Sequence, residues 1–184
     1  MKTKIVSLVV FLALLVAGCI AYPNFSRVNA SVDYCEYSPL LKSDLVVPLA
    51  IEVSGESLYV KLLSHPTKRT QVVVERRSVQ IFVSALDKFI EWDALAKQRG
   101  DRLSKRIGGV SYNGFNYAIR FYTAAEGRHY LLIGIRSKIL GDGPIEPDAL
   151  DLSLDSANAL RLKNVLMAFS ENRLDVSNQD GAYK

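Results

Sequence analysis

The sequence predicts an α+β domain that is rich in antiparallel strands and built on a plan that occurs twice. Three observations carry this prediction. Short apolar segments alternate with period two, which is typical of strands with one buried face. Two segments with helical periodicity each follow such an alternating segment directly. The turns between the strands contain the Gly, Asn, Asp and Pro residues that favour hairpins.

The first half predicts four strands and a helix. A strand over Leu45 to Val53 contains Pro48, which favours a sheet edge or a bulge. Three further strands are predicted over residues 58–62, 71–75 and 79–83. The helix is expected to begin at Ser84, which forms a capping-box pattern with Asp87, and to end at Gly100. Its expected apolar face consists of Leu86, Phe89, Ile90, Ala94 and Leu95, with Trp92 at the margin.

The second half repeats this order. Strands are predicted over residues 107–112, 117–122 and 129–136, and the clearest alternation runs from Leu150 to Leu154. Asp155 is expected to cap a second helix. The inward face of that helix is expected to consist of Ala159, Leu162, Val165, Leu166 and Phe169. Each half therefore ends with an alternating strand that leads directly into a capped helix.

In this order of elements the sequence resembles the Whirly group. That resemblance implies two units of strands and a helix, with the sheets facing outward and the helices packed together. The likeness is in element order alone and involves no shared motif. A single antiparallel sheet with both helices on one face is the alternative architecture.

The first 18 residues have the pattern of a secretory signal. Lys2 and Lys4 precede an apolar run from Ile5 to Ala17, which is too short to span a hydrocarbon core of about 30 Å. Val16-Ala17-Gly18-Cys19 then resembles the lipobox of bacterial prolipoproteins. The resemblance implies a diacylglyceryl thioether on the Cys19 sulfur, cleavage between Gly18 and Cys19, and an acyl chain such as palmitate on the freed amine. An uncleaved anchor or an ordinary cleaved signal is the alternative.

The lipobox resemblance also implies a location. Two or more acyl chains hold a protein firmly, at about 0.8 kcal/mol per buried methylene. Because Ile20 rather than Asp follows the cysteine, the resemblance implies an outer-membrane lipoprotein facing the periplasm. The expected organisation is a signal peptide over 1–18, a lipid-anchored tether over 19–33, a single domain over 34–170 and a polar C-terminal tail over 171–184.

Charge and cysteine content narrow the choice of partner. The net charge is +4, and removal of Lys2 and Lys4 with the leader leaves +2, which does not demand nucleic acid as a partner. If Cys19 carries lipid, Cys35 has no partner in the chain. We expect Cys35 to be buried as a small apolar residue, with an intermolecular disulfide as the alternative.

The sequence contains no strong catalytic signature. His65 and His129 lack a second ligand at zinc spacing, and the segment around Ser111 lacks the second glycine of a nucleophile elbow. Four acids offer oxygen ligands for calcium without the spacing of a calcium loop, and we expect them to be solvated turn residues: Asp142, Glu146, Asp148 and Asp151. The sequence therefore predicts a non-catalytic protein without cofactor or metal.

The best candidate binding surface combines aromatic and basic strand residues, namely Tyr117, Arg120, Tyr122 and Tyr130. The basic runs Lys68-Arg69, Arg76-Arg77 and Arg99 to Arg106 are expected to add to such a patch. This composition suits single-stranded nucleic acid or a protein partner, and the export signal favours protein.

These observations lead to one expected function and two alternatives. The expected function is a membrane-anchored bacterial lipoprotein whose small periplasmic domain binds another envelope protein, in an assembly or immunity-type role. One alternative is an envelope enzyme with an unrecognised site, acting on cell-wall or lipid material. The other is a nucleic-acid-binding module with an exposed sheet, which would apply if the chain is not exported.

Overall fold

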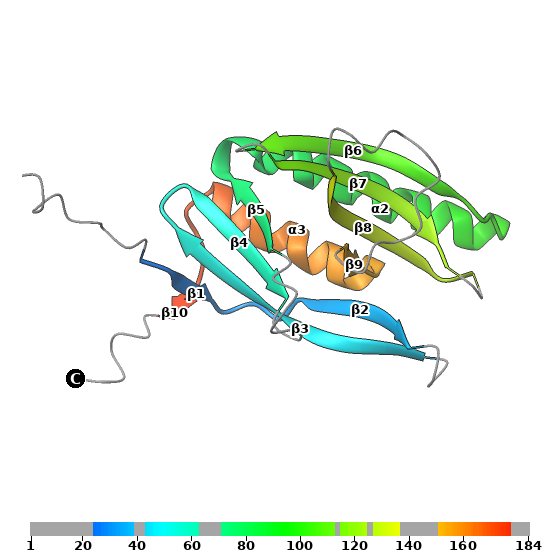
Figure 1. The fold of residues 1–184 in the computed structure, drawn as a ribbon, viewed down its shortest axis with the longest axis horizontal. Coiled ribbons are helices and arrows are strands. Elements are labelled where there is room, and N and C mark those ends of the chain that lie inside the picture. The colour runs from blue at the N-terminus through cyan, green and yellow to red at the C-terminus, as the bar shows by residue number, and fades with distance from the viewer. Residues whose placement is uncertain are drawn as a thin grey trace, which may run out of the picture.

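The fold consists of two antiparallel sheets and two helices (Figure 1). The computed structural model describes residues 24–38, 43–62, 71–112, 115–124, 127–136 and 151–177. The helices are α2 (Val79–Arg99) and α3 (Ser156–Ser170), and each follows a set of antiparallel strands. The predicted class, an α+β fold in which strands and then a helix occur twice, is confirmed.

The first sheet is built around one long strand, β3. Its members are β1 (Ser26–Val28), β2 (Asp33–Ser38), β3 (Ser43–Ser54), β4 (Ser57–Leu62), β5 (Gln71–Glu75) and β10 (Val176–Ser177). The strand order is β10-β1-β3-β4-β5, and β2 also pairs with β3. Pro48 is exposed and pairs with Asp33 in β2, and the pairing of β3 with β4 begins at the next residue, Leu49. The residues that follow β4 lie outside the described ranges, so the predicted edge or bulge at Pro48 stays a prediction.

The second sheet follows the chain order β6 (Ser104–Tyr112), β7 (Phe115–Thr123), β8 (His129–Arg136) and β9 (Leu152–Leu154). Its register shifts between Arg106 and Gly108, which bends the edge strand β6. A Cβ on Gly109 would lie 2.8 Å from the carbonyl oxygen of Tyr117 and 2.8 Å from a guanidinium nitrogen of Arg106. Glycine is needed there because the neighbouring backbone approaches so closely.

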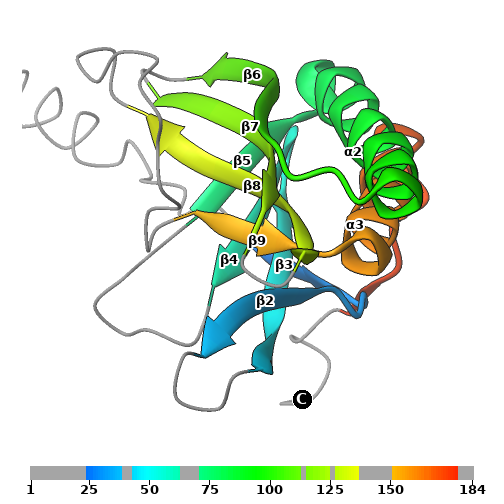
Figure 2. The same cartoon turned by 90° about the vertical axis from the view of Figure 1, so that its right-hand side faces the viewer.

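The two sheets adjoin, and both helices lie on one side of them (Figure 2). β2 lies beside β9 in both views, and the backbone N–H of Val73 in β5 donates to the hydroxyl of Tyr117 in β7 at 3.3 Å. The helices pack against each other and share one core with both sheets. The largest fully buried side chains of that core are Phe82, Phe89, Phe121, Phe169, Ile51, Leu58, Leu86, Ile119, Leu131, Ile133, Leu154 and Leu166.

The start of α2 differs from the prediction. Residues 79–83 form the first turns of the helix rather than a strand, and Ser84 is an exposed residue inside it. A 3-10 turn (η1, Arg76–Ser78) precedes the helix, and Ser78 is its N-cap residue without a side-chain cap. Val79, Phe82, Val83 and Leu86 are buried with a spacing of three to four, so helical burial also explains the apolar pattern that suggested a strand.

The inward face of α2 also differs from the prediction. Ala94 and Leu95 are exposed, although the prediction placed both on the apolar face. Asp93 and Ala96 take the buried positions instead. The end of the helix matches the prediction, because Gly100 adopts the left-handed conformation at φ 69° and stops it. α3 begins as predicted, with the Asp155 carboxylate accepting a hydrogen bond from the N–H of Asn158.

The folded part extends beyond the expected limits of 34 and 170. β1 and the start of β2 lie in the segment expected to be a tether, where Val28 and Val32 are buried. β10 lies in the expected polar tail and pairs with β1. Strands of two or three residues are too short to show alternation, so the sequence pattern did not reveal them. Among the described residues no helix has the length and apolar content needed to cross a membrane.

Candidate functional site

The predicted calcium ligands are only partly covered by the structure. Three of the four, namely Asp142, Glu146 and Asp148, lie outside the described residues, as do the lipobox residues Gly18 and Cys19. Asp151 is described and is 4% exposed just before β9, so it is a buried residue and not the solvated turn residue that we expected. Across the described ranges, no three His, Cys, Asp or Glu side chains lie together as metal ligands.

The four predicted surface residues do not share one surface. Tyr117 is 2% exposed and faces the core, where its ring packs edge-on against Phe82. Arg120 and Tyr122 are half-buried on the other face of β7, and Tyr122 pairs with Tyr130 across the strands. Residues three apart in a strand must point to opposite faces, so the split between Tyr117 and Arg120 follows from the strand geometry.

Tyr130 is also buried, and its partners are polar. Its hydroxyl donates to both carboxylate oxygens of Asp44 at 2.7 Å, and Arg128 donates to the same carboxylate at 3.0 Å. Burial, together with the Asp44 carboxylate, raises the pKa of Tyr130 above its ordinary value. Tyr130 therefore joins β8 to β3 inside the protein.

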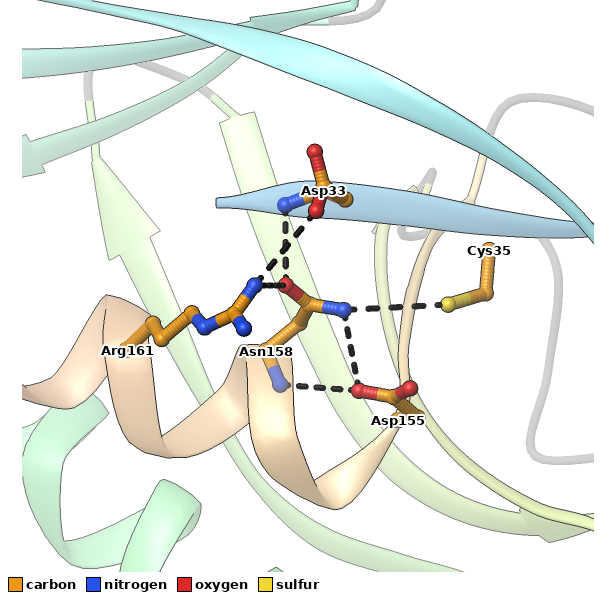
Figure 3. A network of polar contacts seen from close by, with 5 residues as sticks. All are labelled: Asp33, Cys35, Asp155, Asn158 and Arg161. Carbon is orange, nitrogen blue, oxygen red and sulfur yellow. Dashed lines mark hydrogen bonds and ion pairs between the residues drawn. The ribbon is translucent and has the colours of Figure 1, made fainter. Parts of the chain in front are cut away.

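Asn158 at the start of α3 joins the helix to β2, as Figure 3 shows. The side-chain oxygen of Asn158 accepts a hydrogen bond from the N–H of Asp33 at 2.9 Å, and its amide donates to Asp155 at 3.0 Å. Arg161 donates to Asn158 at 3.3 Å and to Asp33 at 3.4 Å. We call these residues, together with Cys35, the Asn158 network. Its hydrogen bonds attach β2 to the N-terminus of α3.

Cys35 completes this network as a buried, free thiol. Its sulfur lies 4.0 Å from the side-chain nitrogen of Asn158 (Figure 3). Burial raises the pKa of Cys35 to about 11, so the thiol stays protonated near neutral pH. The expectation that Cys35 is buried is confirmed.

A second polar cluster lies inside the protein at Asp93. One carboxylate oxygen accepts hydrogen bonds from Lys97 at 2.7 Å and from Ser156 at 2.6 Å, and the other lies 2.9 Å from Nδ1 of His129. We call these four residues the Asp93 cluster. They connect α2, β8 and α3.

The Asp93 cluster contains Ser, His and Asp, but not in the arrangement of a nucleophilic triad. Ser156 and His129 both bind Asp93, whereas a triad needs the hydroxyl to reach the imidazole. The side chain of His129 is 3% exposed and stacks against Phe121. Burial alone would raise the pKa of Asp93, but the hydrogen bonds from Lys97, Ser156 and His129 hold it below its ordinary value. The ionised carboxylate therefore connects three elements, α2, β8 and α3, through its hydrogen bonds.

One open pocket of the described part is a groove between the last turns of α2 and the start of β6. Its volume is about 180 Å³. It is lined by Trp92, Leu95, Ala96, Arg99, Asp101, Leu103 and Lys105, and we call it the Trp92 groove. The ring of Trp92 packs on its inner side against Phe121, with 6.1 Å between the ring centroids.

Basic side chains surround this groove. The amines of Lys88 and Lys105 lie 5.0 Å and 5.3 Å from the centroid of the Trp92 ring, within the range of cation–π interactions. Arg99 in the groove lining is exposed, and so is Arg102, three residues before Lys105 in the chain. In the part of the chain that the structure describes, none of these four cations lies within 4.0 Å of a carboxylate oxygen.

The other predicted basic runs do not extend this surface. Arg76 donates to the backbone oxygen of Phe169 at the end of α3 and to the carboxylate of Glu56 at 2.8 Å. Its guanidinium also lies 4.3 Å from the centroid of the Phe169 ring. Arg76 therefore holds the fold together, and Lys68-Arg69 lies outside the described residues. The sequence analysis did not predict this groove, although the run from Arg99 to Arg106 and the marginal position of Trp92 are signals from which it could have been found.

Comparison with protein-family models, with curated proteins and with solved structures gave no match. The resemblances to bacterial prolipoproteins and to the Whirly group in element order therefore stay predictions from the sequence.

Proposed function

We propose that this chain is a bacterial lipoprotein, anchored in the outer membrane, whose periplasmic domain binds another envelope protein without catalysing a reaction. The observation that carries the proposal is the lipobox pattern Val16-Ala17-Gly18-Cys19 at the end of a secretory signal. Lipid on Cys19 would hold the domain at a membrane surface, where partners are concentrated.

The distance between the anchor and the domain supports a defined orientation. Six residues, Ile20 to Phe25, separate Cys19 from the first strand. At roughly 3.5 Å per extended residue, they span no more than about 20–25 Å. β1, together with its partner β10, would therefore lie within about 25 Å of the membrane surface.

Binding rather than catalysis is supported by how the chemistry-bearing groups are used. Cys35, His129 and Tyr130 are all buried, and each contacts an amide or a carboxylate that connects secondary-structure elements. The Trp92 groove is different, because it combines an apolar floor with cations that have no carboxylate partner in the described structure. Aromatic and arginine side chains of this kind are typical anchors of protein interfaces.

The lipid anchor is tested first, with Cys19→Ser. We expect the variant to lose incorporation of a labelled fatty acid and to accumulate as the unprocessed precursor, because the variant lacks the thiol that carries the lipid. Fractionation of cells and gel mobility provide the measurement. Wild-type processing and membrane retention in the variant would rule out lipidation.

The partner is tested by crosslinking the wild-type lipoprotein in intact envelopes and identifying what it captures. A lipoprotein with the same leader and tether but an unrelated domain provides the control. We expect one or a few envelope proteins that the control does not capture. Identical recoveries from both proteins would contradict the binding role.

A further inference from the structure

We propose that the Trp92 groove binds an acidic segment of the partner protein, with one aliphatic or aromatic side chain inserted against Trp92. The identity of the partner as an envelope protein rests on the proposed function. The chemistry of the occupant rests on the groove itself. Three observations support it, namely the size of the groove, its cations without carboxylate partners in the described residues, and its place in the fold.

The size of the groove favours a single side chain. Its volume of about 180 Å³ lies below the roughly 300–1,000 Å³ of small-molecule sites. Trp92, Leu95 and Leu103 supply an apolar floor, and Leu95 is 37% exposed. Contact between Trp92 and Phe121 keeps the floor in place, so an apolar anchor meets a preformed surface.

The charges around the groove define the rest of the occupant. Lys88, Arg99, Arg102 and Lys105 are exposed without a carboxylate partner in the described residues, whereas the exposed acids nearby in the chain are Asp87, Glu91 and Asp101. Other basic residues do have such partners, for example Arg76 with Glu56 and Lys163 with Asp87. Cations without a carboxylate partner in the described residues, placed around an apolar floor, are complementary to an acidic segment with an apolar anchor.

The place of the groove favours a protein over the membrane that holds the anchor. In Figure 1, α2 ends and β6 begins at the right-hand end of the molecule, whereas β1 and β10 lie at the left. The 21 residues of α2 correspond to about 30 Å of helix. The Trp92 groove therefore lies at the opposite end of the domain from the point where the proposed tether is attached.

The chain offers a built-in probe for this groove, because Trp92 is its only tryptophan. The mature lipidated protein in detergent micelles is titrated with a synthetic peptide of Asp and Glu residues around one central Leu, and the Trp92 emission is recorded. We expect a saturable shift in emission. Replacing the central Leu with Ser should weaken binding about tenfold, and replacing the acids with Lys should abolish it.

A matched pair of double variants locates the binding. Arg99→Glu combined with Lys105→Glu reverses two charges in the groove, and we expect the peptide to bind at least tenfold more weakly. Arg27→Glu combined with Arg77→Glu makes the same change in net charge at exposed positions in β1 and η1, where Arg77 also loses its ion pair with Glu75. We expect that control to bind within about twofold of wild type. Equal weakening in both pairs, or in neither, would overturn the inference.

Vesicles form the third arm of the experiment. For this arm the lipidated protein is transferred from micelles into vesicles. We expect its Trp92 emission to be the same in vesicles of phosphatidylglycerol and phosphatidylcholine as in vesicles of phosphatidylcholine alone. A shift specific to phosphatidylglycerol, combined with no response to the peptides, would make the groove a lipid contact and overturn the proposal.

The crosslinking experiment separates this inference from the proposed function. If the Arg99→Glu and Lys105→Glu variant still captures the envelope partner as well as wild type, the groove inference is wrong and the binding role stands. If the groove binds the peptide but envelopes yield no specific partner, the proposed function is wrong and the chemistry of the groove stands.

Discussion

Trp92 and Asp93 are neighbours in α2, yet they lie in opposite kinds of environment. Trp92 lines an open groove whose cations have no carboxylate partner in the described structure, whereas Asp93 is buried with three hydrogen-bond partners. One residue along a helix turns the side chain by about 100°. One side of α2 therefore contributes to a buried polar cluster, and the adjacent side contributes to an open groove.

The comparison teaches where charge maintains the fold and where it is available for binding. In the Asp93 cluster, one carboxylate satisfies groups from α2, β8 and α3, so its loss should mainly affect stability. In the Trp92 groove, removal of a cation breaks no ion pair in the described structure, so its loss should mainly affect binding. The predictions below test this division, beginning with the largest effect.

Asp93→Ala should lower the free energy of unfolding by about 3–5 kcal/mol, because Ser156 and the buried His129 lose their acceptor. Urea denaturation followed by circular dichroism measures the change. Asp101→Ala, in the wall of the groove, is the control and should change stability by less than about 0.5 kcal/mol. Similar losses in both variants would contradict the division between the two regions.

The stability should also depend on pH through Asp93. Because its pKa is lowered in the folded protein, its contribution is present above the ordinary pKa of Asp, about 3.9, and is lost as the pH falls through the folded value. Denaturation curves between pH 7 and pH 3 should therefore show a steeper acid loss for wild type than for Asp93→Asn. Parallel curves for the two proteins would rule out Asp93 as the titrating group.

Within the Asp93 cluster, the more buried partner of the carboxylate should contribute more to the free energy of unfolding. Ser156→Ala removes a hydrogen bond to a buried carboxylate and should cost about 1.5–3 kcal/mol. Lys97→Ala removes an ion pair whose lysine side chain is 62% exposed, and solvent screening should limit its cost to about 0.5 kcal/mol. The reverse order in urea denaturation would show that Lys97, rather than Ser156, holds the carboxylate.

The smallest effect on stability is expected in the groove. Arg99→Glu combined with Lys105→Glu should change the free energy of unfolding by less than about 0.5 kcal/mol, because both side chains are exposed. Added salt should weaken peptide binding to wild type, since exposed charges are screened within about 10 Å at 0.1 M salt. Strong destabilisation of this variant would show that Arg99 and Lys105 maintain the fold instead of serving mainly for binding.

Much of the fold was visible in the sequence where local signals were strong. β5 and β8 begin and end where predicted, and α3 begins at its predicted Asp155 cap. These elements combine alternation or a capping side chain with clear turns. The start of α2 was missed because residues 79, 81 and 83 satisfy period two while Val79, Phe82 and Val83 satisfy the helical period.

The functional regions were harder to predict because their parts come together only in three dimensions. Asp93 lies at helical spacing from Phe89 and Ala96, so the helical period places it on the inward face although it is charged. Its partners on β8 and α3 are far away in sequence, with separations of 36 and 63 residues. For the groove, the run from Arg99 onward was noted, but the exposure of Leu95 depends on how β6 packs against α2.

The pairing of β1 with β10 has a consequence for the order in which the chain can fold. Ser177 in β10 bonds to the backbone oxygen of Arg27 in β1 across a separation of 150 residues. Such distant contacts form slowly, because the ends of a long chain must first meet. If the chain is exported with its N-terminus leading, as the proposed function requires, β1 would cross the membrane first and its partner strand β10 would follow only after the rest of the domain. The complete sheet would then form last, when the proposed lipid anchor would already hold the leading end.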